Sequence, residues 1–173
     1  MKIYKLISNA TPLIYLAKAN QLRVLQSVVS KIYIPKAVYQ EVVVEGKRLG
    51  EKDAYRVDKA VSEGRITVQE VTELYPVEIK VHSGEVEVIS LAKEMGIDRV
   101  LLDDVKARAA SELAELKPIG TLGIILMAVK DQELSFDQFL ITIEDIVRSG
   151  FYLKEDIYLR AIQAAKKLSE NIM

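Results

Sequence analysis

The sequence contains no cysteine and only one histidine, His82. Without cysteine the chain cannot form disulfide bonds, thiolate zinc sites or a cysteine nucleophile, and this absence suits a reducing cytoplasm. A zinc site would need a second histidine, and a serine-hydrolase triad would have to use His82 although no GxSxG motif is present. We therefore expect His82 to be a loop residue rather than a ligand or a base.

The chain also lacks an excess of charge of either sign, because 24 basic and 25 acidic side chains leave a net charge of −1. Any binding of nucleic acid must then use a local basic patch. No stretch reaches the roughly 18 uninterrupted apolar residues of a membrane span, and the first residues lack the pattern of a secretory signal. We expect a soluble cytoplasmic protein with no membrane association.

Half of the 173 residues are hydrophobic, so 1–173 is predicted to be one domain around one core. The predicted strands are 2–8, 31–35, 65–71 and 99–102. The predicted helices start at Pro12 and near residues 22, 35, 54, 83, 105, 121, 135 and 154, with N-caps at Thr11, Ser83 and Thr121 and a break near Gly46 and Gly50. Because parallel strands need long crossovers, this order predicts an α/β fold of three layers, with a mostly parallel central sheet between helices.

Polar side chains follow the predicted strands where each strand ends. Asn9 follows the first strand, Asp103 and Asp104 follow a later one, and Glu85 opens the helix between them. In open α/β sheets, ligands collect beyond the carboxyl ends of the strands. The sequence therefore predicts that three separate segments deliver oxygen ligands to one edge of the sheet.

Carboxylates gathered at such an edge need a compensating positive charge. Three or four of them within about 5 Å would repel by roughly 3 kcal/mol per pair at an effective dielectric near 20. Mg²⁺ and Mn²⁺ prefer oxygen ligands and often bind through one or two carboxylates together with substrate phosphates. Such a metal lowers the pKa of a bound water and neutralises charge on phosphorus oxygens, which suits phosphodiester hydrolysis.

Each of these acids also has a simpler interpretation. Glu85 could merely stabilise the N-terminus of its helix, and Asp103 and Asp104 could form a turn and a cap. Glu41 lies on a helix that is apolar on one side, and its spacing places it in the site or in solvent with equal weight. The glycines of "GTLG", 120–123, resemble part of a phosphate loop, but they more simply permit close helix packing.

Together these residues resemble a known family, the PIN-domain branch labelled DUF3368, which is related to VapC-type toxins. The motif elements S-N-x-T-P-L-I, G-E and L-D-D-x-x-A-R are jointly specific. The resemblance covers nearly the whole chain, in order, through the segments "ISNATPLIYLAKANQLRVLQSV", "IPKAVYQEV", "SGEVEVISLAKEMGIDRVLLDDVKARAAS" and "IGTLGIILMAVKD".

The resemblance implies a parallel sheet with helices on both sides and an acidic pocket that binds Mg²⁺ or Mn²⁺ for cleavage of single-stranded RNA. Asn9 occupies the position of the first family acid, Glu41 that of the second and Glu85 that of the third. The last acid is Asp103 or Asp104, and the resemblance does not decide between them. Glu41, Glu85, Asp103 and Asp104 are thus the implied catalytic acids, and Asn9 joins the last three as an implied metal ligand.

Three further residues are implied to contact the substrate. Thr11 matches a hydroxyl position near the metal, and Lys106 and Arg108 follow the aspartates, where they would contact the RNA backbone. The chain departs from the family at Asn9, where PIN nucleases generally carry aspartate. Asparagine keeps a carbonyl oxygen that can ligate a metal but gives up a full charge, so it weakens cation affinity.

Two classes of function follow from these residues. The first is a metal-dependent endoribonuclease, possibly the toxin of a toxin–antitoxin pair with an antitoxin protein as partner. The second is a catalytically weakened or inactive PIN module that binds RNA or a protein, for which the neutral Asn9 is the motive. The apolar segment "GIILMAV" predicts either a core helix or the contact surface of a homodimer.

Overall fold

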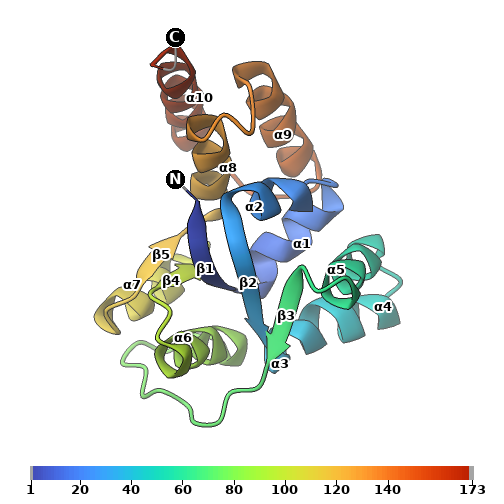
Figure 1. The fold of residues 1–173 in the computed structure, drawn as a ribbon, viewed down its shortest axis with the longest axis vertical. Helices are drawn as coiled ribbons and strands as arrows, with labels where there is room; N and C mark the ends of the chain where they lie inside the picture. The colour runs from blue at the N-terminus through green and yellow to red at the C-terminus, as the bar shows by residue number, and fades with distance from the viewer. Residues whose placement is uncertain (1, 172–173) are drawn as a thin grey trace.

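A parallel β-sheet lies at the centre of the protein (Figure 1). The computed structural model describes residues 2–171, and within them five strands form this sheet in the order β3-β2-β1-β4-β5. Every neighbouring pair is parallel, and Ile7 of β1 aligns with Tyr33 of β2 and with Val100 of β4. The strands are β1 (Ile3–Ser8), β2 (Val29–Pro35), β3 (Ile66–Gln69), β4 (Arg99–Leu101) and β5 (Lys117–Ile119).

Helices cover both faces of this sheet, which confirms the predicted three-layer α/β fold. The first connections contain α1 (Ala10–Lys18), α2 (Leu22–Val28), α3 (Lys36–Tyr39), the π-helical turn η1 (Gln40–Glu45), α4 (Gly46–Arg48) and α5 (Lys52–Ser62). They are followed by α6 (Ser83–Met95), which contacts β1, β2 and β4, and α7 (Val105–Leu113), which contacts β5. Right-handed crossovers place these two helices on the face opposite α1 to α5.

The strand order reverses between β1 and β4. The chain moves outward from β1 to β2 and β3, returns through α6 to β4 on the other side of β1, and then adds β5. In open parallel sheets, such a switch point leaves a crevice at the carboxyl ends of the two strands. Asn9 directly follows β1, and Asp103 lies two residues after the end of β4, so both stand where the strands that border this crevice end.

The last part of the chain forms a group of helices on one end of the sheet (Figure 1). It consists of α8 (Thr121–Lys130), α9 (Phe136–Arg148) and α10 (Glu155–Glu170), which contact one another, and α8 also packs on α2. The apolar segment of α8 is largely core, because Ile124, Ile125, Ala128 and Val129 are buried. No helix within residues 2–171 has both the length and the apolar character of a bilayer-crossing segment.

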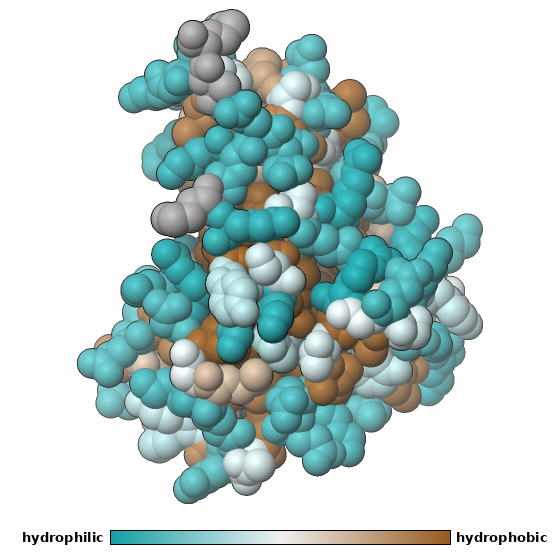
Figure 2. Space-filling model, in the orientation of Figure 1, coloured by the Kyte–Doolittle hydropathy of each residue, from teal (hydrophilic) through white to brown (hydrophobic). Residues whose placement is uncertain are grey.

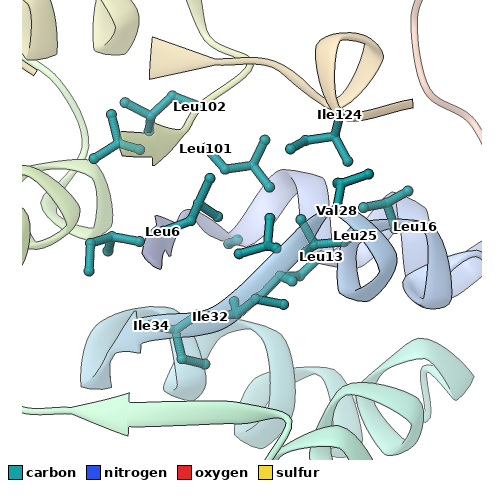
Figure 3. Close-up of a cluster of buried hydrophobic side chains, with 14 of the residues drawn as sticks. Leu6, Leu13, Leu16, Leu25, Val28, Ile32, Ile34, Leu101, Leu102 and Ile124 are labelled. Atoms are coloured by element: carbon teal, nitrogen blue, oxygen red, sulfur yellow. The ribbon is translucent and has the colours of Figure 1, made fainter. Parts of the chain in front are cut away.

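The main hydrophobic core joins the sheet to α1, α2 and α8 (Figure 3). Leu6, Leu13 and Leu25 are fully buried in it, as are Leu101 and Ile124. Burying a leucine side chain stabilises the fold by about 1.5–3 kcal/mol, so this cluster fixes β1 against β4 and thereby the crevice between them. The face seen in Figure 2 is mostly hydrophilic, and hydrophobic residues show mainly between the elements.

Three predicted helix caps are wrong by one or two residues. The cap of α1 is Asn9 rather than Thr11, that of α6 is His82 rather than Ser83, and that of α8 is Gly120 rather than Thr121. Pro12 therefore lies inside the first turn of α1. This is tolerated because the first backbone N–H groups of a helix have no intrahelical partner.

Two other predictions of secondary structure need correction. The segment after β2 stays helical through Gly46 as α3, η1 and α4, and only Gly50, with φ of +77°, ends it. The short strand β5 was not predicted, because Lys117 and Pro118 are poor strand formers. Pro118 fits there because β5 is an edge strand, which needs hydrogen bonds on one side only.

Candidate active site

Asn9 lies at the edge of the sheet where β1 and β4 end. Its backbone N–H donates a hydrogen bond to the carbonyl oxygen of Leu101 at 3.0 Å, which ties the end of β1 to the end of β4. Although Asn9 precedes α1, its side chain makes no capping hydrogen bond to that helix. The residue is 7% exposed. Its amide is therefore a buried polar group at the strand edge that the local helix does not use.

Glu85 is a buried carboxylate in the first turn of α6. One of its oxygens accepts a hydrogen bond from the backbone N–H of His82 at 3.0 Å. Burial raises the pKa of Glu85 above its ordinary value, the His82 N–H opposes this, and the negative charges of Asp104 and Glu41 raise it further. The residue thus stabilises its helix, as the simpler interpretation held, and also faces two other acids.

Glu41 projects toward the same place from η1. A Cβ atom built on Gly84 would lie 3.6 Å from Glu41 Oε2 and 3.9 Å from Asn9 Oδ1. The glycine at the start of α6 therefore leaves room for both oxygens. π-Helical turns occur frequently at functional sites, and this one carries Glu41 at its beginning. The sequence left two orientations open for Glu41, toward the site or toward solvent. The residue is exposed, and its carboxylate also lies close enough to Glu85 to raise the pKa of that residue.

The structure separates the roles of the two adjacent aspartates. Both carboxylate oxygens of Asp103 accept hydrogen bonds from Thr121, one from its backbone N–H at 2.7 Å and one from its hydroxyl at 2.6 Å. Burial raises the pKa of Asp103, whereas these hydrogen bonds and the charge of Arg108 lower it. Asp103 is thus held by Thr121 at the start of α8, and it lies close enough to Arg108 to feel its charge.

Asp104, in contrast, is exposed and caps α7, with Oδ1 accepting from the backbone N–H of Ala107 at 2.9 Å. Its charge acts on Glu85, and the two residues line the same cavity. The cap therefore matches the simpler interpretation of this aspartate, and it uses one carboxylate oxygen only. Asp104 is the member of the pair that is placed to share a ligand with Glu85.

The three predicted substrate contacts lie around these aspartates. Thr11 and Arg108 line a cavity of about 720 Å³ that also includes Asp103 and Asp104. Lys106 lines a second cavity, of about 590 Å³, with Glu85 and Asp104. The structure thus places all three near the acids without bringing them together in one cavity.

The oxygen donors around Glu85 suit a divalent cation by their chemistry. Among residues 2–171, no group of three or more His, Asp or Glu side chains is already arranged around one point as a metal site. The available donors are nevertheless all oxygens, from Glu85, Asp104, Glu41 and Asn9. Hard cations prefer such donors. Burial is the main cause of the raised pKa of Glu85, and the negative charges of Asp104 and Glu41 add to it. The chemistry of these residues fits a cation such as Mg²⁺ or Mn²⁺.

Sequence reasoning missed two residues that shape this site. Gly84 keeps the space beside Glu41 and Asn9 open, and Thr121 fixes Asp103. The signals were the glycine before Glu85 and the threonine after Gly120, which looked like a helix start and a cap. The glycines of "GTLG" serve close packing, because a Cβ on Gly123 would lie 2.8 Å from the side chain of Ile119.

Comparison with known proteins agrees with this geometry. The family described as DUF3368, PIN domain, matches residues 5–167. The chain belongs to this family of PIN domains. Membership suggests a nuclease, and PIN domains generally use divalent metal ions. The family resemblance predicted from the motifs is therefore confirmed, and so is the PIN-like fold class.

Two other comparisons say little about the function of this PIN domain. No curated protein matches the chain. A solved domain of a functionally unknown protein from Methanocaldococcus jannaschii DSM 2661 is similar at 17% identity and a TM-score of 0.46, over 68% of this chain and 90% of that one. The roles of individual residues therefore rest on the geometry above.

Proposed function

We propose that this PIN domain is a divalent-metal-dependent endoribonuclease that cleaves single-stranded RNA. The observation that carries the proposal is the position of Glu85. It is buried at the start of α6 beside the negative charges of Asp104 and Glu41, and burial and these charges raise its pKa. This concentration of oxygen donors lies at the switch point of the sheet, where parallel α/β folds bind ligands.

Glu85, Asp104 and Glu41 would hold the cation, with the carbonyl oxygen of Asn9 as a neutral fourth donor. A bound Mg²⁺ or Mn²⁺ supplies an activated water and neutralises charge on the phosphate. Asp103 acts differently, because Thr121 fixes its carboxylate by two hydrogen bonds and its negative charge attracts Arg108 toward the acids. Arg108 and Lys106 then bind backbone phosphates, and Thr11 offers a hydroxyl group to a phosphate oxygen or a water.

A cleavage assay tests this proposal. The protein is incubated with a mixed pool of RNA and Mn²⁺ or Mg²⁺, and we expect cleavage that stops when a chelator is added. Glu85→Gln keeps the size and the hydrogen-bond acceptor but removes the charge, so we expect cleavage to fall by about 100-fold or more. The matched control is Glu112→Gln, which removes an exposed acid from α7 and should cleave like the unaltered protein.

Cleavage that survives both the chelator and Glu85→Gln would reject the proposal. Thermal melting of both variants shows that they are folded, so a loss of cleavage can be assigned to the charge at residue 85. Equal losses in Glu85→Gln and Glu112→Gln would also contradict it, because the control residue is exposed and lines neither of the cavities that contain the acids.

A second candidate function is favoured by Asn9. A neutral residue at the buried centre of the site lowers the charge available for a cation, and this suits a PIN module that binds RNA or a protein without cleaving it. Such a module would bind RNA with no turnover in Mn²⁺. Its affinity would fall with increasing salt, because phosphate contacts release counterions.

The toxin role, an antitoxin partner, a homodimer and a cytoplasmic location stay predictions. The toxin role predicts a neighbouring small reading frame for a DNA-binding protein, and co-expression with it should suppress RNA cleavage. Light scattering tests the homodimer, which a monomer at high protein concentration would contradict.

A further inference from the structure

Asp104 lines two separate cavities. One has a volume of about 590 Å³ and also contains Glu85, and the other has about 720 Å³ and also contains Asp103 and Arg108. Asp104 lines both, so the two cavities meet at a residue that is one of the proposed ligands of the cation.

The first cavity is lined by basic side chains as well as by the acids. Its wall includes Lys80, His82 and Lys106, and all three are exposed. No ion pair between these lysines and an acid occurs in residues 2–171, so both ammonium groups are available to a ligand. Flexible cations of this kind bind backbone phosphates without reading a base.

The second cavity is apolar and aromatic away from the acids. Tyr15, Phe151 and Tyr152 line it together with aliphatic side chains of α8. Tyr15 and Phe151 pack edge to face with ring centroids 5.5 Å apart, so Phe151 is fixed in the wall. Tyr152 is 81% exposed. Exposed aromatic rings beside a phosphate-binding cation are the usual platform on which unpaired bases stack.

We propose that the two cavities form a single path for single-stranded RNA that divides at Asp104 into a backbone half and a base half. Lys80, His82 and Lys106 hold phosphates on one side of the cleaved bond. Phe151 and Tyr152 stack bases on the other side, with Arg108 on the phosphate between them. This inference rests on the proposed nuclease function and adds an asymmetry to it: phosphate charge is needed on one side and bases on the other.

Modified substrates test this asymmetry. A short RNA with one mapped cleavage site is prepared with an abasic ribose, or with a neutral methylphosphonate linkage, two nucleotides to either side of that site. We expect the abasic ribose to slow cleavage by about tenfold on one side only, because stacking of one base is lost there. The methylphosphonate should slow cleavage on the opposite side only. Equal effects on both sides, or both effects on the same side, would overturn the proposal.

Variants connect each half to its residues. Tyr152→Ala should raise the KM of the unmodified RNA by about tenfold and leave kcat nearly unchanged, while Tyr152→Phe restores it because phenylalanine also stacks. Tyr152→Ala should cleave the abasic substrate no more slowly than the unaltered protein does, because the stacked base is already absent. The control is Tyr4→Ala, since Tyr4 is 63% exposed on β1 away from both cavities and should be neutral.

The backbone half is tested in the same way. Lys80→Gln should weaken binding of the unmodified RNA. It should have no effect on binding of the RNA that carries the methylphosphonate on the sensitive side. The same comparisons can be made without turnover, by measuring how tightly labelled RNA binds to Glu85→Gln in chelator. If the unaltered protein does not cleave RNA, the nuclease function is rejected, and these binding measurements still test the path. If Tyr152→Ala changes self-association and leaves RNA binding unchanged, the aromatic cavity is a protein interface and the proposal is wrong.

Discussion

Asp58 and Glu85 both accept hydrogen bonds, but their pKa values move in opposite directions. Asp58 accepts from the Lys47 ammonium group and from the Tyr39 hydroxyl, at 3.0 Å for the latter. The Lys47 hydrogen bond is the main reason that the pKa of Asp58 is lowered, and burial opposes it. Burial is the main reason that the pKa of Glu85 is raised, and Asp104 adds to it. Only Asp58 has a cation of its own.

The difference separates a structural acid from a site that needs an external charge. Tyr39 and Lys47 flank the π-helical turn that carries Glu41, so one stretch of chain contributes to both groups. In this stretch Lys47 compensates the charge of Asp58, whereas no lysine accompanies Glu41 where it approaches Glu85. The pair around Asp58 fixes α3 and α4 against α5. Glu85 and Glu41 form no ion pair with a lysine or arginine among the described residues, and a bound cation would supply the missing positive charge.

Removing one charge from each group should give the largest contrast. Asp104→Asn should lower metal-dependent RNA cleavage by at least about 100-fold, since loss of a metal ligand removes several kcal/mol of transition-state stabilisation. Asparagine caps helices as well as aspartate does, so α7 should stay intact. Asp58→Asn should cleave within about twofold of the unaltered protein. Initial rates with Mn²⁺, and the rise in Tm that Mn²⁺ produces, measure both effects.

Asp103→Asn sharpens this contrast. Because Asp103 acts through Thr121 and Arg108, its variant should lose about tenfold in cleavage, as is typical of residues that orient a metal site. It should keep most of the rise in Tm with Mn²⁺, which Asp104→Asn should lose. A larger loss for Asp103→Asn than for Asp104→Asn would reverse the roles that the geometry gives to the two aspartates.

Adding a charge to the strand edge should produce a smaller effect of opposite sign. Asn9→Asp places another carboxylate beside Glu41, so we expect about tenfold tighter Mn²⁺ binding and a faster cleavage rate. In chelator the same variant should melt at a lower temperature, because the added charge is buried near other acids. Asn171→Asp adds the same charge to an exposed position after α10 and is the control. A slower enzyme with unchanged Mn²⁺ affinity would contradict this view of Asn9.

The sequence predicted the strand edge better than it predicted the contacts within it. Alternating strands and helices fix which residues follow which strand, so Asn9, Glu85, Asp103 and Asp104 could be assigned to one edge without coordinates. The choice between the two aspartates could not be made that way. It depends on Thr121, which follows β5, a strand that the composition of the chain did not reveal.

Glu41 shows the same limit at the level of one helix. A regular helical period did not decide whether the Glu41 side chain points to the site or to solvent. The chain forms a π-helical turn there, and this changes the direction of the following side chains. Helix caps were misplaced for a related reason. Asn9, His82 and Gly120 take the capping positions because strand ends and tertiary contacts set where each helix begins. Local propensity is only a weak prior for that choice.

The smallest expected effect is on stability in the absence of metal, where the two acids should differ in sign. The pKa of Glu85 is raised in the folded protein, so the unfolded chain loses its proton first as pH rises above about 4.3 and stability falls. Glu85→Gln removes this loss and should raise Tm at pH 7 by about a few degrees. Asp58 has a lowered pKa, which stabilises the fold above about pH 4. Asp58→Asn should therefore lower Tm at pH 7 by a similar amount.

Both differences in Tm should vanish as the pH is lowered, but at different pH values. The advantage of Glu85→Gln should disappear as pH falls toward 4, because the folded protein then carries a neutral Glu85. The deficit of Asp58→Asn should persist to lower pH, since Asp58 keeps its charge in the folded state until pH falls through its lowered pKa. Calorimetry in chelator between pH 3 and 8 measures both curves. If Glu85→Gln melts below the unaltered protein at pH 7, then Glu85 is compensated within the chain, and the contrast with Asp58 on which the cation site depends is lost.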